Sequence, residues 1–223
     1  MSEPAVLLGI YGTGGCARGI MPLARVMPVP LAAGRSHEWV WVDDFTDRPV
    51  VNGHRVLRHV QFVAHPAAEK RVAIAIANSE IRARIAARCT ADGLGFITIT
   101  AASTILMDDV EVGEGSILSP YVTVTSNVRI GKHFHANLYS YVEHDSVVGD
   151  FVTFAPGAKC NGNVVIEDHA YIGSNAVLIQ GKPGAPLVIG RGAIVGMGAV
   201  VTRSVAPGAT VVGNPARPQE KNS

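Results

Sequence analysis

This chain is poor in aromatic residues and has no large excess of charge of either sign. Only 6% of its 223 residues are Phe, Trp or Tyr, although 48% are hydrophobic and 24 are glycine. We therefore expect a core of Val, Ile, Leu and Ala joined by many tight turns. The formal net charge of +1 gives no basis for binding nucleic acid or an acidic membrane surface.

Cysteines and long apolar runs are also scarce. The cysteines, Cys16, Cys89 and Cys160, are odd in number and widely separated, which favours reduced thiols and a cytoplasmic protein. No apolar run reaches the roughly 20 residues that a membrane span needs, and the first residues lack the pattern of a signal peptide. The chain is long enough for one large domain or two small ones.

Residues 1–101 alternate between strand and helix patterns. Apolar strands are predicted at residues 5–12, 38–44 and 70–78, and the third is almost continuously apolar, as expected for a buried parallel strand. A glycine-rich turn and a helix follow the first strand, and a helix behind a serine cap is predicted over residues 79–93. The alternation predicts a parallel, Rossmann-like βαβ domain.

From Leu106 onward, apolar or small residues recur every six positions. Thirteen successive positions fit this frame up to Leu178, and the frame breaks at QGKPGAP before resuming five residues late at Ile189. A six-residue period is typical of a parallel β-helix, in which three hexads form one triangular coil. We therefore predict a β-helix of hexapeptide repeats over residues 102–223, in which residues eighteen apart lie one above another.

A histidine–aspartate pair lies between the frame positions Val142 and Val148, in the segment SYVEHDSVVGD. His144 lies two residues past the inward position Val142, so it is predicted to lie outside the core near a corner. Asp145 can orient the imidazole as a proton acceptor. Gly162, eighteen residues on, is predicted one coil above and offers a bare N–H to an oxyanion. This arrangement predicts acyl transfer; the alternative is a solvated histidine without a catalytic role.

The first half of the chain also contains candidate binding residues. Gly12, Gly14 and Gly15 follow the first strand and open a helix, whose N-terminus can bind a pyrophosphate although the glycines do not complete a G-x-G-x-x-G motif. Asp43 and Asp44 follow the second strand, where they can contact a base or sugar hydroxyls. The alternative for the two aspartates is a turn and a helix cap.

The segment NLYSYVEHDSVVGDFVTFAPGAKCNGNVVI resembles the active-site coils of the hexapeptide-repeat sugar acetyltransferases. The N-terminal segments YGTGGCAR, VDD and AIANSEIR resemble the nucleotide-sugar-binding domain of one bacterial group, and IVGMGAVVTRSVAPGATVVGNPAR resembles its coenzyme A end. This group comprises nucleotide-linked amino-sugar N-acetyltransferases and sialic-acid O-acetyltransferases. The resemblance covers nearly the whole chain and implies that the β-helix is left-handed.

The resemblance also implies roles for four residues of the predicted site. His144 matches the family's general base, and Asp145 matches the acid beside it. Asn137 matches a polar residue that lines the acceptor pocket, and Gly162 matches the amide donor to the thioester carbonyl. We therefore expect acetyl-CoA to be the acetyl donor.

In the family that the chain resembles, acetyl-CoA lies in the groove between neighbouring β-helices of a homotrimer. Gly173, Ser174, Gly196 and Gly198, together with Gly162, match positions where the cofactor passes close to the backbone. The alternative for these glycines is that they only allow the coil to turn. We expect a homotrimer and neither a nucleic-acid partner nor a membrane span.

Three features depart from the family pattern. Cys16 stands where the family commonly has a histidine after the glycines, and Thr153 stands where many members have a second active-site histidine. The usual His-Pro before the first coil is missing from TITAAST. The identity of the acceptor sugar therefore stays open.

The expected activity is transfer of acetyl from acetyl-CoA to an amino group of a nucleotide-linked, 4-amino-deoxy sugar, for surface-polysaccharide or glycan assembly. Two alternatives remain: a sugar O-acetyltransferase of the sialic-acid type, and a non-catalytic nucleotide-sugar-binding protein. The nucleotide base and the sugar are not specified by the sequence.

A metal enzyme on a β-helix, as in the β-helical carbonic anhydrases, would need three histidines that meet. The available histidines are His133, His135, His144 and His169, and no two of them are eighteen residues apart. We therefore expect that they do not stack and that the protein has no metal site.

Overall fold

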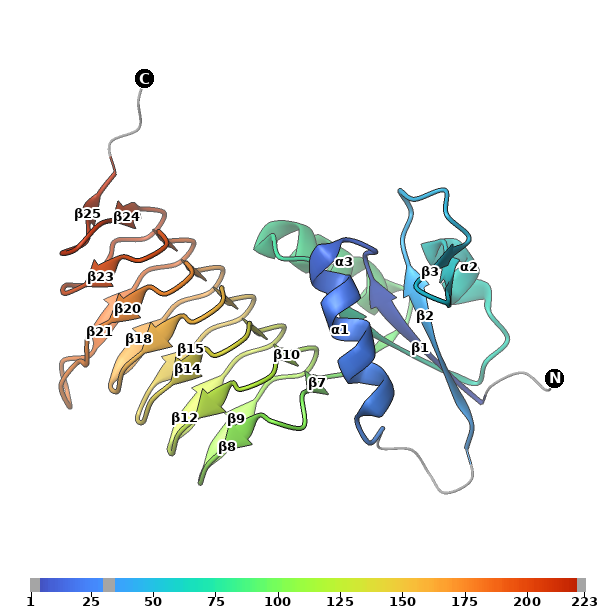
Figure 1. The fold of residues 1–223 in the computed structure, drawn as a ribbon, viewed down its shortest axis with the longest axis horizontal. Coiled ribbons are helices and arrows are strands. Elements are labelled where there is room, and N and C mark those ends of the chain that lie inside the picture. The colour runs from blue at the N-terminus through green and yellow to red at the C-terminus, as the bar shows by residue number, and fades with distance from the viewer. Residues whose placement is uncertain (1–4, 30–34, 220–223) are drawn as a thin grey trace. The chain divides into compact units, whose positions relative to one another are not determined.

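The computed structural model describes residues 5–29 and 35–219. The chain divides into two compact units, Met1–Thr100 and Ala101–Ser223 (Figure 1). Within the described ranges, no helix has the length and apolar character required to cross a membrane. All three cysteines are free thiols, as predicted.

The first unit is built on a six-stranded sheet with the strand order β3-β4-β2-β1-β5-β6. Five of its strands run parallel, and β3 pairs antiparallel with β4. The strands of this sheet are β1 (Val6–Tyr11), β2 (His37–Val42), β3 (Val50–Val51), β4 (His54–Leu57), β5 (Glu69–Ile74) and β6 (Gly95–Phe96), and the short strand β7 (Ile99–Thr100), which follows them, is not part of it. The three strands predicted from the sequence are confirmed as β1, β2 and β5, with shorter bounds.

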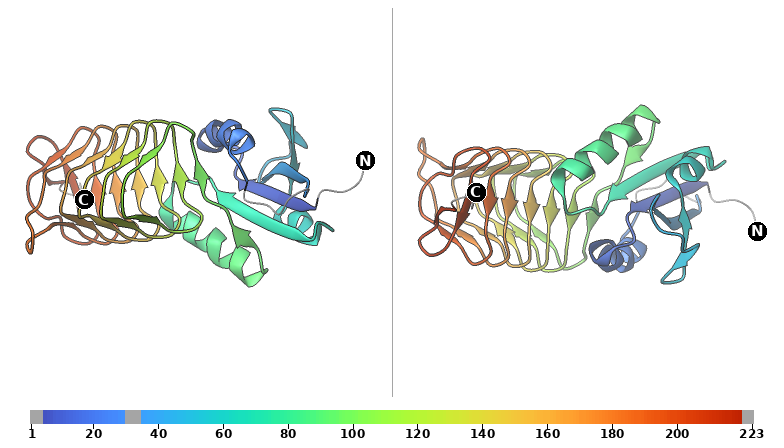
Figure 2. Two further views of the ribbon diagram at one scale, coloured as in Figure 1. Left: turned by 90° about the horizontal axis from the view of Figure 1, so that it is seen from below. Right: turned by 90° about the horizontal axis from the view of Figure 1, so that it is seen from above.

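Three helices accompany this sheet: α1 (Gly15–Val26), α2 (His59–Ala64) and α3 (Ser79–Ala91). The chain crosses from β1 to β2 in one direction and returns past β1 to β5, and right-handed crossovers of opposite direction place helices on opposite faces. Figure 2 shows α1 (blue) and α3 (green) on the two faces of the sheet. Every residue of β1 is buried, so the core of the unit lies along this central strand.

Two details of the predicted helices need correction. The cap of α3 is Asn78, whose side chain accepts a hydrogen bond from Ile81 N at 2.9 Å; Ser79, the predicted cap, is the first helical residue. The helix α2 was not predicted, because six residues are too few to show a helical period.

The second unit is a parallel β-helix, whose coils follow one another from β8 to β24 in Figure 1. Its three parallel sheets contain β8-β11-β14-β17-β20-β23, β9-β12-β15-β18-β21 and β10-β13-β16-β19-β22-β24, with β25 antiparallel to β24. The strands are β8 (Ile105–Leu106), β9 (Val110–Val112), β10 (Ile117–Leu118), β11 (Thr123–Val124), β12 (Val128–Ile130), β13 (His135–Ala136), β14 (Tyr141–Val142), β15 (Val147–Val148), β16 (Thr153–Phe154), β17 (Lys159–Cys160), β18 (Val164–Ile166), β19 (Tyr171–Ile172), β20 (Val177–Leu178), β21 (Leu187–Ile189), β22 (Ile194–Val195), β23 (Val200–Val201), β24 (Thr210–Val212) and β25 (Arg217–Pro218).

The strand register confirms the predicted eighteen-residue step. Val142 pairs with Cys160, and Cys160 pairs with Leu178. After the Gly/Pro-rich insertion, Leu178 pairs with Val201, five residues beyond the regular step. Most inward positions are buried along the coils. Leu106 pairs in register with the buried Val124, as the frame predicts, but it is 45% exposed because β8 is the end strand of its sheet.

The corners of the coil are not restricted to small residues. Residues three positions past the frame adopt left-handed φ values, and these include residues with large side chains such as Tyr121 and Phe151. The glycines directly after the frame are needed for another reason: a Cβ on Gly113 would lie 2.5 Å from the backbone of Gly131 in the next coil. Close approach of stacked coils therefore requires glycine at that position.

The histidines of the β-helix also correct an expectation. His133 and His169 lie two coils apart in one column, with Phe151 between them. The ring centroids are 4.9 Å apart for His133 and Phe151 and 5.2 Å apart for Phe151 and His169. The expectation that the histidines do not stack is therefore wrong for His133 and His169, which share one column, although no two histidines lie in adjacent coils of it.

Candidate active site

His144 lies at the corner between β14 and β15, with 44% of its side chain exposed. Its Nδ1 donates a hydrogen bond to Asp145 Oδ2 at 2.8 Å. Asp145 adopts the left-handed conformation of the corner, with φ of 56°, a conformation that Asp tolerates better than most residues. The predicted histidine–aspartate pair is therefore formed, on the outside of the coil.

Asp145 is held as a carboxylate. The hydrogen bond with His144 lowers the pKa of Asp145, and a bond from Asn127 Nδ2 at 3.3 Å lowers it further. An ionised acceptor beside Nδ1 fixes the proton on that nitrogen and leaves Nε2 with a lone pair. The pair can therefore act as a proton acceptor at Nε2.

Gly162 lies against the imidazole of His144, as the eighteen-residue step predicts. A Cβ built on Gly162 would lie 2.5 Å from both Nε2 and Cε1 of His144, so a side chain at this position would displace the ring. The carbonyl of Gly162 accepts a hydrogen bond from Gly181 N at 2.9 Å. Over the described part of the chain, the N–H of Gly162 has no hydrogen-bond acceptor.

The remaining predicted acceptor residue of the β-helix is Asn137. It is half-buried, and its Oδ1 accepts a hydrogen bond from Leu138 N at 2.8 Å. Within the described hydrogen bonds it has none to His144. Thr153, which stands where many family members have a histidine, is only 6% exposed and lies in β16.

Glycine is required by the packing of the coils at two of the positions that are predicted to contact coenzyme A. A Cβ on Gly173 would lie 2.6 Å from Met197 N, and one on Gly196 would lie 2.7 Å from Val212 Cγ1. Coil stacking therefore accounts for glycine at both positions. Gly198 has φ of +67° and open space around its α-carbon, and its N–H donates to the carbonyl of Ser174 at 2.8 Å. Contact of these four residues with coenzyme A remains a prediction.

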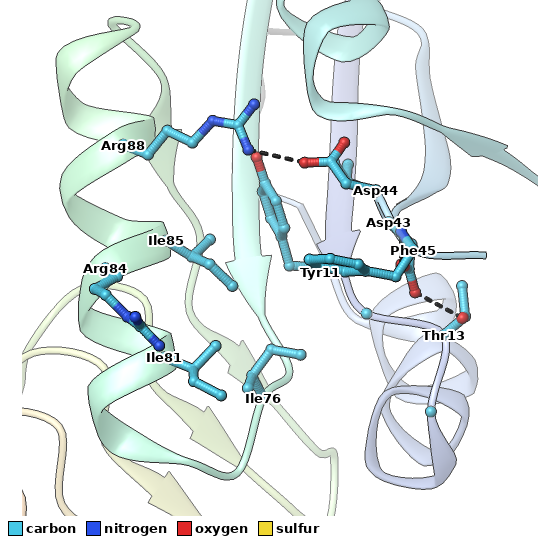
Figure 3. A pocket seen from close by; sticks show the side chains of 13 residues that line it. Tyr11, Thr13, Asp43, Asp44, Phe45, Ile76, Ile81, Arg84, Ile85 and Arg88 are labelled. Atoms are coloured by element: carbon cyan, nitrogen blue, oxygen red, sulfur yellow. Dashed lines mark hydrogen bonds and ion pairs between the residues drawn. The ribbon is translucent and has the colours of Figure 1, made fainter.

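A cavity of about 600 Å³ opens in the first unit at the carboxyl ends of β1, β2 and β5 (Figure 3). The crossover after β1 leads to β2, and the crossover after β5 leads to β6 on the other side. The crevice where crossovers diverge is the usual ligand site of an open parallel sheet. Its lining residues are Tyr11, Gly12, Thr13, Gly14, Val42, Asp43, Asp44, Phe45, Ile76, Ile81, Arg84, Ile85 and Arg88.

The predicted glycines lie at this cavity and at the start of α1. Gly12 has φ of +92°, and a Cβ there would lie 2.8 Å from Ile76 Cδ1. Gly14 is the N-cap of α1 and has no capping side chain, while open space surrounds the α-carbons of Gly14 and Gly15. Gly15 begins the helix but is not one of the lining residues. The first N–H groups of α1 are therefore accessible to an anion.

Both predicted aspartates line the cavity, but their carboxylates already accept hydrogen bonds. Asp43 accepts from Thr13 Oγ1 at 2.7 Å and from Phe45 N at 2.9 Å. Asp44 accepts from His59 N and from Arg88 Nη1, each at 2.8 Å. Burial raises the pKa of Asp44, but the bonds from His59 and Arg88 outweigh burial and lower it. The alternative is therefore confirmed in part: Asp43 accepts a bond within the turn, and Asp44 accepts one from the first residue of α2.

Sequence reasoning missed the apolar wall and the cations of this cavity. Ile81 and Ile85 lie four residues apart on α3 and face it, and Arg84 and Arg88 come from the same helix. Phe45 stands at the opening with 97% of its surface exposed. The i, i+4 spacing of the two isoleucines was a usable signal, whereas nothing in the sequence marks an exposed loop phenylalanine.

A partly buried polar chain that begins at Tyr11 in the cavity wall was also missed. Tyr11 Oη hydrogen-bonds to His59 Nδ1, and His59 Nε2 lies 2.6 Å from Asp92 Oδ2. His59 is 2% exposed. These contacts join β1, α2 and the end of α3, and they fix the ring of Tyr11 at the cavity wall.

The repeated three-strand coils of the parallel β-helix define a protein of the hexapeptide-repeat class. No protein-family model matches the chain, but individual proteins do. The chain is 48% identical over 216 residues to a GDP-perosamine N-acetyltransferase of Escherichia coli O157:H7, covering 97% of each chain. It therefore belongs to the hexapeptide-repeat family of nucleotide-sugar N-acetyltransferases.

Two solved structures are similar over nearly the whole chain. WeeI from Acinetobacter baumannii AYE is 51% identical, with a TM-score of 0.91, and covers 96% of this chain and 100% of its own. The acetyltransferase domain of PglB from Neisseria gonorrhoeae FA1090, in complex with acetyl coenzyme A, is 27% identical, with a TM-score of 0.81 and coverage of 96% and 98%.

Proposed function

We propose that this enzyme transfers the acetyl group of acetyl-CoA to the amino group of a nucleotide-linked 4-amino-deoxy sugar, and that GDP-perosamine is the first acceptor to test. The observation that carries the proposal is the imidazole of His144, bonded to Asp145 and packed on Gly162. The acceptor is suggested by the relative that is 48% identical. As the resemblance implies, the product would be used in surface-polysaccharide or glycan assembly.

The proposed reaction uses the neutral amine, because an ammonium has no lone pair. The amine nitrogen attacks the thioester carbonyl carbon, and the carbonyl π electrons move to oxygen, where the Gly162 N–H stabilises the oxyanion. His144 Nε2 takes one proton from the nitrogen. The adduct then re-forms the carbonyl and expels the coenzyme A thiolate, which receives the proton from His144. The products are an amide and a thiol.

The nucleotide is proposed to bind in the cavity of the first, Rossmann-like unit. The open N–H groups at the start of α1 suit a diphosphate. The ring of Phe45 and the side chains of Ile81 and Ile85 provide apolar surfaces of the kind on which a nucleobase packs. Asp43, already oriented by Thr13, would accept a hydrogen bond from the base or the sugar.

The acetyl-CoA site is proposed to require more than one copy of the chain. In this proposal the β-helix is left-handed, three copies form a homotrimer, and the cofactor lies in the groove between neighbouring β-helices. Gly173, Ser174, Gly196 and Gly198 would then line its path toward Gly162. The support is the family membership of the chain together with the PglB domain, which was solved with acetyl coenzyme A.

The test is a panel of GDP-, UDP- and dTDP-linked amino sugars, incubated with acetyl-CoA and the purified protein. Release of thiol measures turnover, and mass spectrometry of the product locates the acetyl group. We expect an N-acetylated GDP-linked sugar. Acetylation of hydroxyl groups only would support the O-acetyltransferase alternative, and binding without any turnover would support a non-catalytic protein.

A further inference from the structure

A second polar side chain lies directly beside Gly162. Asn161 follows β17, and Tyr141 in β14, one coil below, donates a hydrogen bond from its hydroxyl to Asn161 Oδ1 at 2.8 Å. Burial raises the pKa of Tyr141, and the nearby charge of Glu143 raises it further. The hydroxyl is therefore protonated near neutral pH and can serve as the donor.

The hydrogen bonds of Asn161 leave one group available. Its backbone N–H donates to the Leu178 carbonyl at 3.3 Å, and its carbonyl accepts from Cys160 Sγ at 3.5 Å. Its Oδ1 is taken by Tyr141. Within the described chain, the Nδ2 amide has no acceptor. The bond from Tyr141 therefore orients the side chain and leaves its NH₂ group free to donate.

The backbone geometry places a second free donor next to this amide. The Asn161 carbonyl points toward the sulfur of Cys160, which is fully buried in the core. In a trans peptide the carbonyl and the following N–H point in opposite directions. The Gly162 N–H therefore points away from the sulfur of Cys160, and the His144 ring lies against the α-carbon of the same glycine.

We propose that the Asn161 side-chain amide is a second oxyanion donor, which acts with the Gly162 N–H on the carbonyl oxygen of the acetyl thioester, and that Tyr141 is its positioning residue. This inference rests on the proposed acetyl transfer. When the amine attacks, the carbonyl electron pair moves to oxygen, and two N–H donors then share that charge until the thiolate leaves. Donors held before the reaction stabilise a developing charge without reorganisation.

The experiment compares Asn161→Ala and the isosteric Asn161→Asp with the unaltered enzyme. Asn161→Asp can still accept the bond from Tyr141 but offers no amide donor. We expect both variants to lower kcat by about 10²-fold, the usual effect of losing one oxyanion donor, with KM for the sugar and affinity for free coenzyme A unchanged. Tyr141→Phe should give a smaller loss of kcat, and the control Tyr121→Phe, at an exposed stacked ring, should give none.

Infrared spectroscopy of bound, carbonyl-labelled acetyl-CoA provides a readout that a purely structural role would not change. We expect the carbonyl stretch to move to higher frequency in Asn161→Ala, because the carbonyl loses one donor. Normal kcat in both Asn161 variants would overturn the inference, as would a raised sugar KM at unchanged kcat, which would make Asn161 a sugar-binding residue. Absence of acetyl transfer by the unaltered enzyme would instead refute the proposed function.

Discussion

At the scale of single residues, Gly162 shows how one missing side chain shapes the site. The ring of His144 occupies the space that a Cβ would fill. This contact was predictable, because a fixed eighteen-residue step places residue 162 above residue 144. The bond of Tyr141 to Asn161 was not predictable, because a repeat fixes which residues are neighbours but not which rotamers they adopt.

Gly162→Ala tests this contact. The added methyl group should push the half-exposed imidazole off its position, so kcat should fall by at least about tenfold, because small displacements of a catalytic group are costly. Thermal unfolding should change little, since the ring can swing into solvent. The matched control is Gly19→Ala on α1, where a Cβ meets nothing within 4 Å; it should keep full activity. Unchanged kcat in Gly162→Ala would show that the ring position is unimportant.

Phe45 provides a second test at this scale. With 97% of its surface exposed at the cavity, it contributes little to folding, so its removal should report on ligand binding alone. Stacking of a base on an aromatic ring contributes about 1–3 kcal/mol. Phe45→Ala should therefore raise KM for the nucleotide sugar by about fivefold or more and leave KM for acetyl-CoA unchanged.

The control for Phe45 is Val60→Ala, an exposed position on α2 outside the lining of this cavity. It should change neither KM. If Phe45→Ala leaves both KM values unchanged as well, the base does not pack on this ring. Equal increases in both would argue against separate sites for the sugar nucleotide and acetyl-CoA.

At the scale of elements, Asp44 joins the loop after β2 to two helices. Its carboxylate accepts from the first N–H of α2 and from Arg88 on α3. The strands and α3 were predictable from local apolar patterns, but α2 was not. Its anchors, Asp44 and Asp92, are 15 and 33 residues from His59, so no local pattern reveals them. The apolar wall of the cavity had a local signal in the i, i+4 spacing of the two isoleucines on α3, but their proximity to Phe45 could not be predicted because the loop after β2 is far from α3 in sequence.

Asp44→Asn tests this junction through pH. Because the folded-state pKa of Asp44 is lowered, its stabilising effect is present above the unfolded-state pKa of about 3.9 and is lost as pH falls through the lower folded-state value. At pH 7 the substitution should reduce the free energy of unfolding by about 1 kcal/mol. Urea unfolding at about pH 7 and about pH 3 should show the difference shrinking with acid; a constant difference would assign it to packing.

At the scale of the whole molecule, each of the two units is proposed to bind a different substrate. The β-helix carries His144 and the proposed acetyl-CoA groove, and the α/β unit carries the nucleotide cavity. The repeat made the β-helix almost fully readable from the sequence, whereas the first unit was readable only as alternating elements. The cavity in the first unit is lined by four separate segments of the chain, and no short sequence motif predicts that these segments lie together.

Sedimentation equilibrium tests the proposed assembly. We expect a homotrimer, because the acetyl-CoA groove would be completed only by a neighbouring β-helix. Activity should fall on dilution if the trimer dissociates, since each site would lose one wall. A stable monomer with full activity at all concentrations would contradict the shared site.

The most direct test of the central claim is the turnover of His144→Ala with GDP-perosamine, measured at saturating acetyl-CoA. General-base assistance usually contributes about 10²–10⁴-fold, so kcat should fall by that factor, while affinity for acetyl-CoA stays nearly unchanged. Asp145→Asn should lose less, because Asp145 only orients the ring. Near-normal turnover of His144→Ala, with the chemical step shown to limit the rate, would contradict the account.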